Sequence, residues 1–297
     1  MKIYIKLVFA MILWGGTFIS GRVLSQDFHP FTIAFWRFAI ASVFLSAVLI
    51  KDSRAFPSLN KYKVFKVVLL GLSGVFAYNY FFFSGLSSVE AGKASVIIAI
   101  NPTVTAFIAS VFMGEGASFK KIVGIFTALS GALVVITKGE GLKLNFEEFG
   151  YGEGYLLCAV LCWVGYTLIG KVALKKLTAL EATTLACICG TLMLAPFAYF
   201  YDGFELVAKA NLKQWWHLFY LGSLGTGLGF IWFYEGIQQI GASRAASFIN
   251  LVPVAGVSIG AIALGEKINN SLLLGGILVL FGINLVNWSA QKTLPRH

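Results

Sequence analysis

Long apolar segments separated by short polar connections set the pattern of the whole chain. Ten segments of roughly 20 apolar residues follow one another, and each is long enough to cross a bilayer as an α-helix. The predicted spans cover residues 5–23, 31–50, 64–84, 93–113, 119–137, 152–171, 180–200, 214–235, 243–264 and 271–289. The pattern therefore predicts an all-α integral membrane protein with ten transmembrane helices.

One segment occurs twice, which indicates an internal duplication. Residues 91–115 read AGKASVIIAINPTVTAFIASVFMGE and residues 242–266 read ASRAASFINLVPVAGVSIGAIALGE. A shift of 151 positions aligns Pro102 with Pro253 and the two final Gly-Glu pairs with each other. It aligns six pairs of glycines in all, one of which belongs to the Gly-Glu ends. Self-similarity at a fixed shift points to a repeated structural unit.

The two repeats are expected to be inverted. Five spans fall in residues 5–138 and five in residues 152–289, and the polar segment 138–151 joins them. Because five is an odd number, the second repeat must enter the bilayer from the opposite side. A proline inside a span removes one backbone hydrogen bond and bends the helix. Bent helices at matched places in two halves are typical of a transport site near the bilayer centre.

Composition supports a membrane protein and predicts its orientation. The chain is 58% hydrophobic and 12% charged, whereas soluble domains carry roughly 25% charged residues. Its net charge of +10 does not indicate nucleic-acid binding, because the basic residues lie in short connections between spans. Fifteen Lys and Arg residues fall on the side of the N-terminus and seven on the other. This bias predicts a multi-pass protein of the cytoplasmic membrane with both termini in the cytoplasm.

The residues that several other functions require are missing or scattered. The four cysteines all fall inside apolar spans, so we expect packing rather than disulfides or a zinc site. The three histidines lie in connections or at ends, and no group of catalytic acids or metal ligands is expected within the spans. No phosphate-binding GxxxxGK[ST] segment occurs. We therefore expect neither an enzyme nor an ATP-driven pump, and no cofactor or metal.

Polar and aromatic residues within the spans are the candidates for contact with a solute. The expected substrate-binding residues are Trp14, Tyr78, Asn79, Asn101, Trp163, Tyr166, Trp232, Tyr234, Ser247 and Asn250. The amides of Asn101 and Asn250, beside the prolines, either satisfy the opened backbone or bind a ligand. Trp14 and Trp163, one in each repeat, either pack or form opposing aromatic walls around a neutral or zwitterionic solute.

Two charged residues and the two prolines are the candidates for gating or coupling. Arg37 lies within a span, about 9 Å from the helix end, and either contacts a substrate carboxylate, forms part of a gate, or is a structural group. Glu235 either carries a proton or pairs with Arg244. Pro102 and Pro253 are the expected bends.

The acids of the two Gly-Glu pairs, Glu115 and Glu266, have a simpler interpretation. Each lies just before the start of an apolar span. A carboxylate in such a place stabilises a helix N-terminus or pairs with a nearby basic residue at the membrane interface. A role of either acid in transport is the less favoured alternative.

The order and doubling of these segments resemble the EamA branch of the drug/metabolite transporter superfamily. The resemblance rests on Trp14-Gly15-Gly16, the spacing from Pro30 to Arg37, the paired proline spans that end in Gly-Glu, and the pairs Gly124 and Gly131, Gly275 and Gly282. It implies ten helices in two inverted repeats around a central cavity that opens alternately to either side. It also implies export or exchange of small metabolites, amino acids often among them. The second repeat departs from the first, because Ala186 stands where the first has Arg37.

We therefore expect a secondary transporter that moves small metabolites such as amino acids by alternating access. The alternatives are a transporter of other small organic solutes, such as drugs or sugar derivatives, and a channel or lipid translocator, which the bent and duplicated helices disfavour. The expected partners are a small-molecule substrate and the lipid bilayer, with proton coupling as an option. The sequence leaves the substrate, the direction of transport and the oligomeric state open.

Overall fold

The described part of the chain is helical throughout. The computed structural model describes residues 2–53, 60–112, 118–137, 150–174, 176–201, 203–240 and 248–291, and within these ranges it contains no β-strand. Seven helical runs there are long and apolar enough to cross a membrane, and two shorter apolar helices, Phe248–Leu264 and Asn270–Val286, accompany them. The prediction of an all-helical protein with several membrane-spanning helices is confirmed.

The helices follow the predicted apolar segments closely. In the first half they are α1 (Lys2–Leu24), α2 (Pro30–Ser53), α3 (Lys61–Leu70), η1 (Gly71–Ala77), α4 (Tyr78–Leu86), α5 (Ala91–Ile98), α6 (Asn101–Phe112) and α7 (Phe119–Ile136). In the second half they are α8 (Tyr151–Ala173), α9 (Ala179–Phe200), α10 (Gly203–Ala208), α11 (Leu212–Phe219), η2 (Tyr220–Leu228), α12 (Gly229–Ile240), η3 (Phe248–Asn250), α14 (Leu251–Leu264) and α15 (Asn270–Gln291). The short helix α10 falls between two predicted spans and was not expected.

Two glycine-rich stretches wind as π-helices, which the apolar pattern did not predict. They are η1, in the continuous run α3–η1–α4, and η2, in the run α11–η2–α12. A π-helix places its hydrogen bonds one residue further apart than an α-helix and is frequent at functional sites. Polar side chains bond to the carbonyls of these wide turns. Asn79 Nδ2 donates to the carbonyls of Gly74 and Val75, and Thr226 Oγ1 donates to that of Leu221.

Both prolines lie beside a helix interruption rather than within a bent helix. Helix α5 ends at Ile98 and α6 begins at Asn101, which places Pro102 in the first turn of α6. The 3₁₀ turn η3 precedes α14, and Pro253 is the third residue of α14. Proline is well tolerated in the first turn of a helix, because the N–H there has no helical acceptor. This corrects the expected mid-helix bend to a break on the N-terminal side of each proline.

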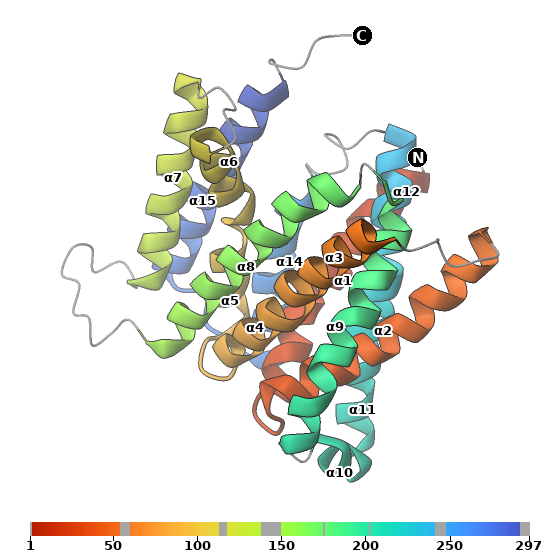
Figure 1. The fold of residues 1–297 in the computed structure, drawn as a ribbon. Helices are drawn as coiled ribbons and strands as arrows, with labels where there is room; N and C mark the ends of the chain where they lie inside the picture. Colours follow the sequence, from red (N-terminus) through yellow and green to blue (C-terminus); the bar gives the residue numbers. More distant parts are fainter. Residues whose placement is uncertain are drawn as a thin grey trace.

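Helices of the first half pack mainly against helices of the second. Helix α1 packs against α12, η2 and α14, whereas α8 packs against α4, η1, α5 and α6. Helix α2 contacts η2, α9 contacts η1, and α2 and α9 contact each other. Helices α7 and α15 pair along much of their length, at the left of Figure 1. The main contacts therefore form between the halves.

Glycines let the backbones of α7 and α15 approach closely. A Cβ atom at Gly124 would lie 2.8 Å from the carbonyl oxygen of Gly282, and one at Gly131 would lie 2.7 Å from that of Gly275. In the aligned repeats Gly124 matches Gly275 and Gly131 matches Gly282. Gly124 therefore faces Gly282, which is the match of Gly131, and Gly131 faces Gly275, which is the match of Gly124. Small residues of this kind are typical of helix interfaces in membranes, where close backbone packing drives association.

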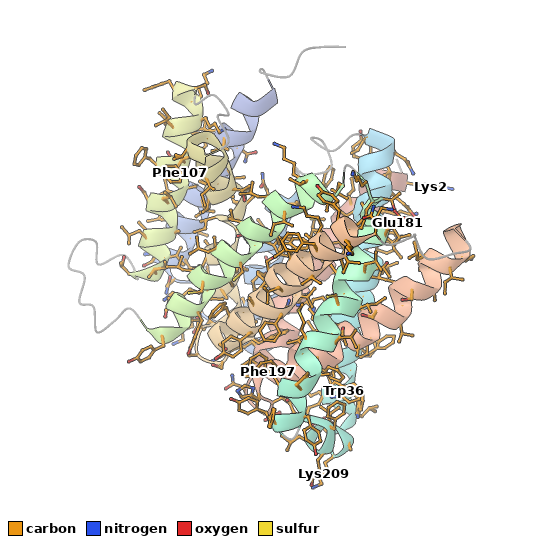
Figure 2. All side chains as sticks on the ribbon, viewed as in Figure 1. Lys2, Trp36, Phe107, Glu181, Phe197 and Lys209 are labelled. Carbon is orange, nitrogen blue, oxygen red and sulfur yellow. The ribbon has the colours of Figure 1, made fainter. Side chains whose placement is uncertain are left out.

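The molecule has two distinct ends and an apolar outer surface. Figure 2 shows Lys2 and Glu181 at one end, which we call the terminal end, and Lys209 at the other, which we call the α10 end. Helix α1 begins and α15 finishes at the terminal end (Figure 1). Large apolar side chains such as Phe107 and Phe126 are 49% and 67% exposed. Such exposure along apolar helices suits contact with lipid.

Candidate substrate-binding site

Five of the predicted site residues gather where α2, α4, α8 and η2 approach one another. Together with one residue of η2 they form a group that we call the arginine cluster, which comprises Arg37, Tyr78, Asn79, Trp163, Tyr166 and Thr226. Two hydrogen bonds donated by the Arg37 guanidinium group hold it together. Arg37 Nε donates to Thr226 Oγ1 over 3.1 Å, and Arg37 Nη1 donates to Asn79 Oδ1 over 3.1 Å. One side chain of α2 thus connects the two π-helical regions.

The two acceptors are held in place by their own hydrogen bonds. The amide nitrogen of Asn79 lies 3.1 Å from the Gly74 carbonyl oxygen and 2.9 Å from that of Val75. These bonds fix the orientation of the amide and direct its oxygen towards Arg37. Thr226 Oγ1 donates to the Leu221 carbonyl over 2.9 Å, so its lone pair is available to the guanidinium. The local backbone of each π-helix therefore positions the acceptor.

Aromatic rings form a second side of the arginine cluster. The Trp163 ring lies 5.0 Å from that of Tyr78 and 5.1 Å from that of Tyr166, measured between centroids. Tyr78 also stacks on Phe82, with centroids 5.6 Å apart. All three rings of the cluster are only half-buried. They leave apolar and π surface beside a fixed cation, which is an environment suited to a small amphipathic solute.

The hydrophobic core surrounds the guanidinium. Its central carbon lies 5.2 Å from the Phe38 ring centroid and 5.9 Å from that of Phe83. Phe83 is fully buried, and both rings belong to the largest apolar cluster of the molecule, against which Tyr78 also packs. The cation thus lies in an apolar region where electrostatic interactions are only weakly screened.

Trp14 lies on a different aromatic cluster. Its indole N–H donates to the Gly225 carbonyl of η2 over 2.9 Å, and its ring lies 5.3 Å from Phe230 and 5.2 Å from Phe233. Trp163 packs on α4 in the first half, whereas Trp14 packs on α12 in the second. The two tryptophans therefore occupy corresponding places in the two halves and belong to different aromatic clusters. Their contact with a substrate stays a prediction.

Glu235 has a basic partner that the sequence did not suggest. Its carboxylate lies 2.5 Å from Lys6 Nζ of α1, and the two side chains are 34% and 41% exposed. The expected alternative partner, Arg244, lies outside the described residues. The ion pair joins the first half to the second near the terminal end.

The residues beside the prolines differ in how well they are satisfied. Asn101 is buried, and its Oδ1 atom has no hydrogen-bond partner among the residues that the structure describes, as is also true of Thr103 Oγ1. Asn250 Nδ2 instead donates to Asn284 Oδ1 of α15 over 3.3 Å. Buried polar atoms without a partner are rare and require an explanation, such as a bound water or ligand. The break before Pro102 therefore joins the arginine cluster as a candidate contact for solute.

The remaining predicted site residues give less information. Trp232 is half-buried in α12. Tyr234 belongs to the same helix, but its side chain lies outside the described part of the structure, as do Ser247 and Glu115. Pro253 is buried, and its carbonyl oxygen lies 3.4 Å from Ser95 Oγ of α5. Helix α14, which carries Pro253, is thus in contact with α5, the helix that precedes the break before Pro102.

Two polar connections at the α10 end tie α5 to the second half of the chain. Glu266 follows Gly265, whose φ of +68° ends α14 in the left-handed region that glycine adopts without strain. The Glu266 carboxylate accepts from the backbone N–H groups of Ala91 and Gly92 over 2.7 and 2.8 Å. Glu266 therefore binds a helix N-terminus, but that of α5 in the other repeat rather than that of the span which follows it in the sequence.

The second connection is an ion pair. Lys93 Nζ lies 2.6 Å from Glu153 Oε1 of α8 and also donates to the Ile136 carbonyl. The side chains of Lys93 and Glu153 are only 14% and 11% exposed. Sequence reasoning missed this pair, as it missed Thr226, because the partners are far apart in the chain and no local pattern connects them.

Among the hollows on the surface of the described structure are two that lie away from the arginine cluster. One, of about 500 Å³, lies near Glu266 and is lined by Arg22, Val23, Gln26, Glu90, Leu264, Gly265, Glu266 and Lys267. The other, of about 750 Å³, is an apolar hollow lined by Leu212, Lys213, Trp215, Trp216 and Phe219. The first hollow places charged groups at the α10 end, around the Glu266 connection.

Known proteins resemble the chain over nearly its whole length. "Uncharacterized transporter YyaM" of Bacillus subtilis (strain 168) is 29% identical over 95% of this chain and 92% of its own. "Probable terminal-alkyne amino-acid exporter" of Streptantibioticus cattleyicolor is 27% identical over 98% of this chain and 94% of its own. A solved crystal structure matches with a TM-score of 0.63 at 16% identity, over 96% of this chain and 98% of that one. The last likeness shows a shared fold.

The match to a protein family agrees with these relatives. The EamA-like transporter family matches residues 1–137 and 150–288. This covers the described helices of both halves, including those that carry the arginine cluster. The chain belongs to the EamA-like transporter family, whose members are multi-pass membrane proteins.

Proposed function

We propose that this protein is a secondary transporter that exports or exchanges small metabolites, amino acids among them, by alternating access. The substrate lies between two inverted five-helix repeats, residues 5–138 and 152–289, in a bundle of ten transmembrane helices. The observation that carries the proposal is the reciprocal packing of the two halves. Several main contacts between the halves come in matched pairs: α1 packs against α12, η2 and α14 as α8 packs against α4, η1 and α6, and α2 contacts η2 as α9 contacts η1.

The matched special segments support the same arrangement. A shift of 151 residues brings η1 (Gly71–Ala77) onto residues 222–228 of η2. The same shift brings the interruption before Pro102 close to the one before Pro253. Broken and π-helical segments lack the regular hydrogen bonds of an α-helix, and in transporters such segments line the binding site. We infer that these four segments surround the substrate and change shape during transport.

The contacts at the two ends are the candidate gates. At the α10 end the Lys93–Glu153 pair and the Glu266 carboxylate hold α5 to the second half. At the terminal end the Lys6–Glu235 pair joins α1 to α12. Alternating access requires that contacts at one end open while those at the other end hold. Because the α10-end contacts are the more buried, we propose that this end is closed here.

Orientation follows from the position of the chain ends. Helix α1 begins and α15 finishes at the terminal end (Figure 1), and the excess of Lys and Arg lies on that side. By the positive-inside rule, the protein lies in the cytoplasmic membrane with its terminal end facing the cytoplasm. The α10 end then faces outward.

Amino acids are proposed as substrates for two reasons. The S. cattleyicolor relative is named as an amino-acid exporter, and the arginine cluster offers a cation, amide and hydroxyl groups and aromatic surface within a small region. A zwitterion with an apolar side chain matches that set. Proton coupling is proposed as a secondary feature, with Glu235 as the acid to test.

Counterflow in proteoliposomes tests the proposal. The purified chain is reconstituted with an unlabelled amino acid inside, and each of the 20 labelled amino acids is supplied outside. A carrier accumulates label transiently against the unlabelled pool, without ATP. A channel or lipid translocator shows no such trans-stimulation. Absence of counterflow for every amino acid would overturn amino-acid transport.

A further inference from the structure

Arg37 is a cation in an apolar region without a charged partner. In the part of the chain that the structure describes, no carboxylate lies within ion-pair distance of its guanidinium. The groups around it are neutral: Thr226 Oγ1, Asn79 Oδ1, and the rings of Phe38 and Phe83. A charged side chain inside a membrane protein is unfavourable unless it is hydrated or paired. Two hydrogen bonds to neutral acceptors offset only part of that cost.

The guanidinium is held in position but retains donors for a ligand. Its bonds to Thr226 and Asn79 use two of the five N–H donors that an arginine carries. Both acceptors are fixed by backbone carbonyls of the π-helices, so the guanidinium plane is fixed as well. A preorganised guanidinium fork matches the two oxygens of a carboxylate, with which it forms short charge-assisted bonds.

The described groups near the cation are aromatic rings rather than acids. Tyr78 immediately precedes Asn79 in the chain, and its ring continues through Trp163 to Tyr166 with centroid separations of 5.0 and 5.1 Å. Half-buried aromatic faces accept apolar groups, and they also accept an ammonium group through cation–π interaction. No described carboxylate is placed there to attract a purely cationic solute.

We propose that Arg37 binds the carboxylate of the transported solute, which restricts the substrate class to small carboxylate-bearing molecules with an apolar or aromatic part. Cationic amines and neutral compounds of the same shape are rejected, because they leave the arginine without a counter-charge. This inference rests on the proposed transport function and specifies the chemistry of its site. The second repeat has the buried Ala186 at the aligned position, so the carboxylate is bound by one repeat alone.

The test compares matched compounds on the unmodified protein. Labelled amino acid is exchanged in proteoliposomes, and three competitors are added at increasing concentration. The first is the same amino acid unlabelled, and the second is its carboxamide, which has the same shape but no anionic charge. The amine that lacks the carboxyl carbon is the third competitor. We expect the carboxamide and the amine to compete at least ten-fold more weakly than the acid. Equal competition by acid and carboxamide would overturn the inference and leave transport intact.

Variants locate the discrimination at Arg37. Arg37→Gln should reduce competition by the acid to the level of the carboxamide, whereas Arg37→Lys should keep part of the difference, since a point charge lacks the planar fork. The matched control is Arg22→Gln. Arg22 lies near the end of α1, donates to the carbonyl of Leu86 at the end of α4, and is not part of the arginine cluster. Retention of full discrimination by folded Arg37→Gln would overturn the assignment. Exchange of no compound in the panel would overturn both the transport function and this inference.

Discussion

Individual charged residues in this protein differ sharply in how far they are removed from solvent. Lys93 and Glu153 form a pair whose side chains are 14% and 11% exposed, whereas those of Lys209 and Glu205 are 72% and 68% exposed. An exposed pair contributes little, because water and ions screen it. Removal of one partner from a buried pair leaves an uncompensated charge, which is strongly destabilising.

The first prediction concerns that buried pair. Lys93→Met should lower the free energy of unfolding by about 3 kcal/mol, because Glu153 would remain buried without its partner. Lys209→Met is the matched control and should leave stability nearly unchanged, because its pair with Glu205 is exposed to solvent. Thermal unfolding in detergent micelles measures both. If the two variants lost equal stability, the Lys93–Glu153 pair would not be a buried connection.

A second residue-scale prediction addresses proton coupling. We expect Glu235→Gln to retain amino-acid exchange in the absence of a pH gradient but to lose uptake driven by one, because an amide at this half-exposed position cannot take up a proton. Lys6→Gln should retain both. The measurement is uptake driven by an imposed pH gradient, compared with exchange in its absence. Selective loss of gradient-driven uptake in Glu235→Gln alone would identify Glu235 as the proton carrier.

At the scale of elements, α5 and α14 are connected at both ends of their contact. Near the interruptions, Ser95 Oγ lies 3.4 Å from the Pro253 carbonyl oxygen, and at the α10 end Glu266 accepts two N–H groups of α5. The first N–H groups of a helix have no acceptor within the helix, so a carboxylate there also interacts with the helix dipole. The start of α5 is therefore held from outside its own repeat.

We predict that Glu266→Gln loosens the first turn of α5. The amide keeps an acceptor oxygen but loses the charge, and hydrogen bonds to charged groups are the stronger by about 1 kcal/mol. Hydrogen exchange of a peptide that covers Ala91 and Gly92 should become several-fold faster. Glu205→Gln, on the short helix α10, serves as the control. Unchanged protection of the α5 start would show that the Glu266 contact does not hold it.

The interruption before Pro102 gives another element-scale prediction. Pro102→Ala restores a backbone N–H that can bond to the Ile98 carbonyl, so α5 and α6 can join into one helix. We expect Pro102→Ala to have equal or greater thermal stability and to exchange amino acids across the membrane more slowly. Pro196→Ala is the control, because Pro196 lies inside the unbroken helix α9. Exchange at the normal rate in Pro102→Ala would show that the interruption is not needed for transport.

The apolar pattern predicts element positions well and their internal geometry poorly. Each predicted span overlaps helical residues, because roughly 20 apolar residues in lipid must satisfy their backbone within a helix. The π-helices η1 and η2 were not predicted, because α- and π-turns bury similar residues. The place of each break relative to its proline was also missed, since proline in a first helical turn and proline in a kink look alike in sequence.

The candidate site was predicted in part for a related reason. Arg37, Asn79 and Trp163 stood out as polar or aromatic groups within spans. In the structure Arg37 donates to Asn79, and Trp163 packs against Tyr78, the residue before Asn79. Thr226 did not stand out, because threonine is common in membrane helices and only a contact across 189 residues reveals its partner. Local pattern selects the residue types, whereas their pairing depends on how the halves pack.

At the scale of the whole molecule, the halves depend on each other. The main contacts of α1 and α8 lie in the opposite half, so neither half buries its apolar surface alone. We therefore expect a folded state only when both are present, as one cooperative unit. The predicted orientation is tested with reporters on the two ends of the chain. Reporters active in the cytoplasm at both termini would agree with the proposal, and activity outside at either one would contradict it.

The unequal burial of the end contacts has a consequence for the response to ionic strength. Solvent-exposed charges are largely screened from each other beyond about 8 Å at about 0.15 M salt and beyond about 3 Å at about 1 M, whereas buried contacts are screened much less. Salt should therefore weaken Lys6–Glu235 while leaving Lys93–Glu153 almost untouched. A cell with a high salt concentration in its cytoplasm would then hold a larger share of these molecules opened towards its interior, and a cell with a dilute cytoplasm a smaller one.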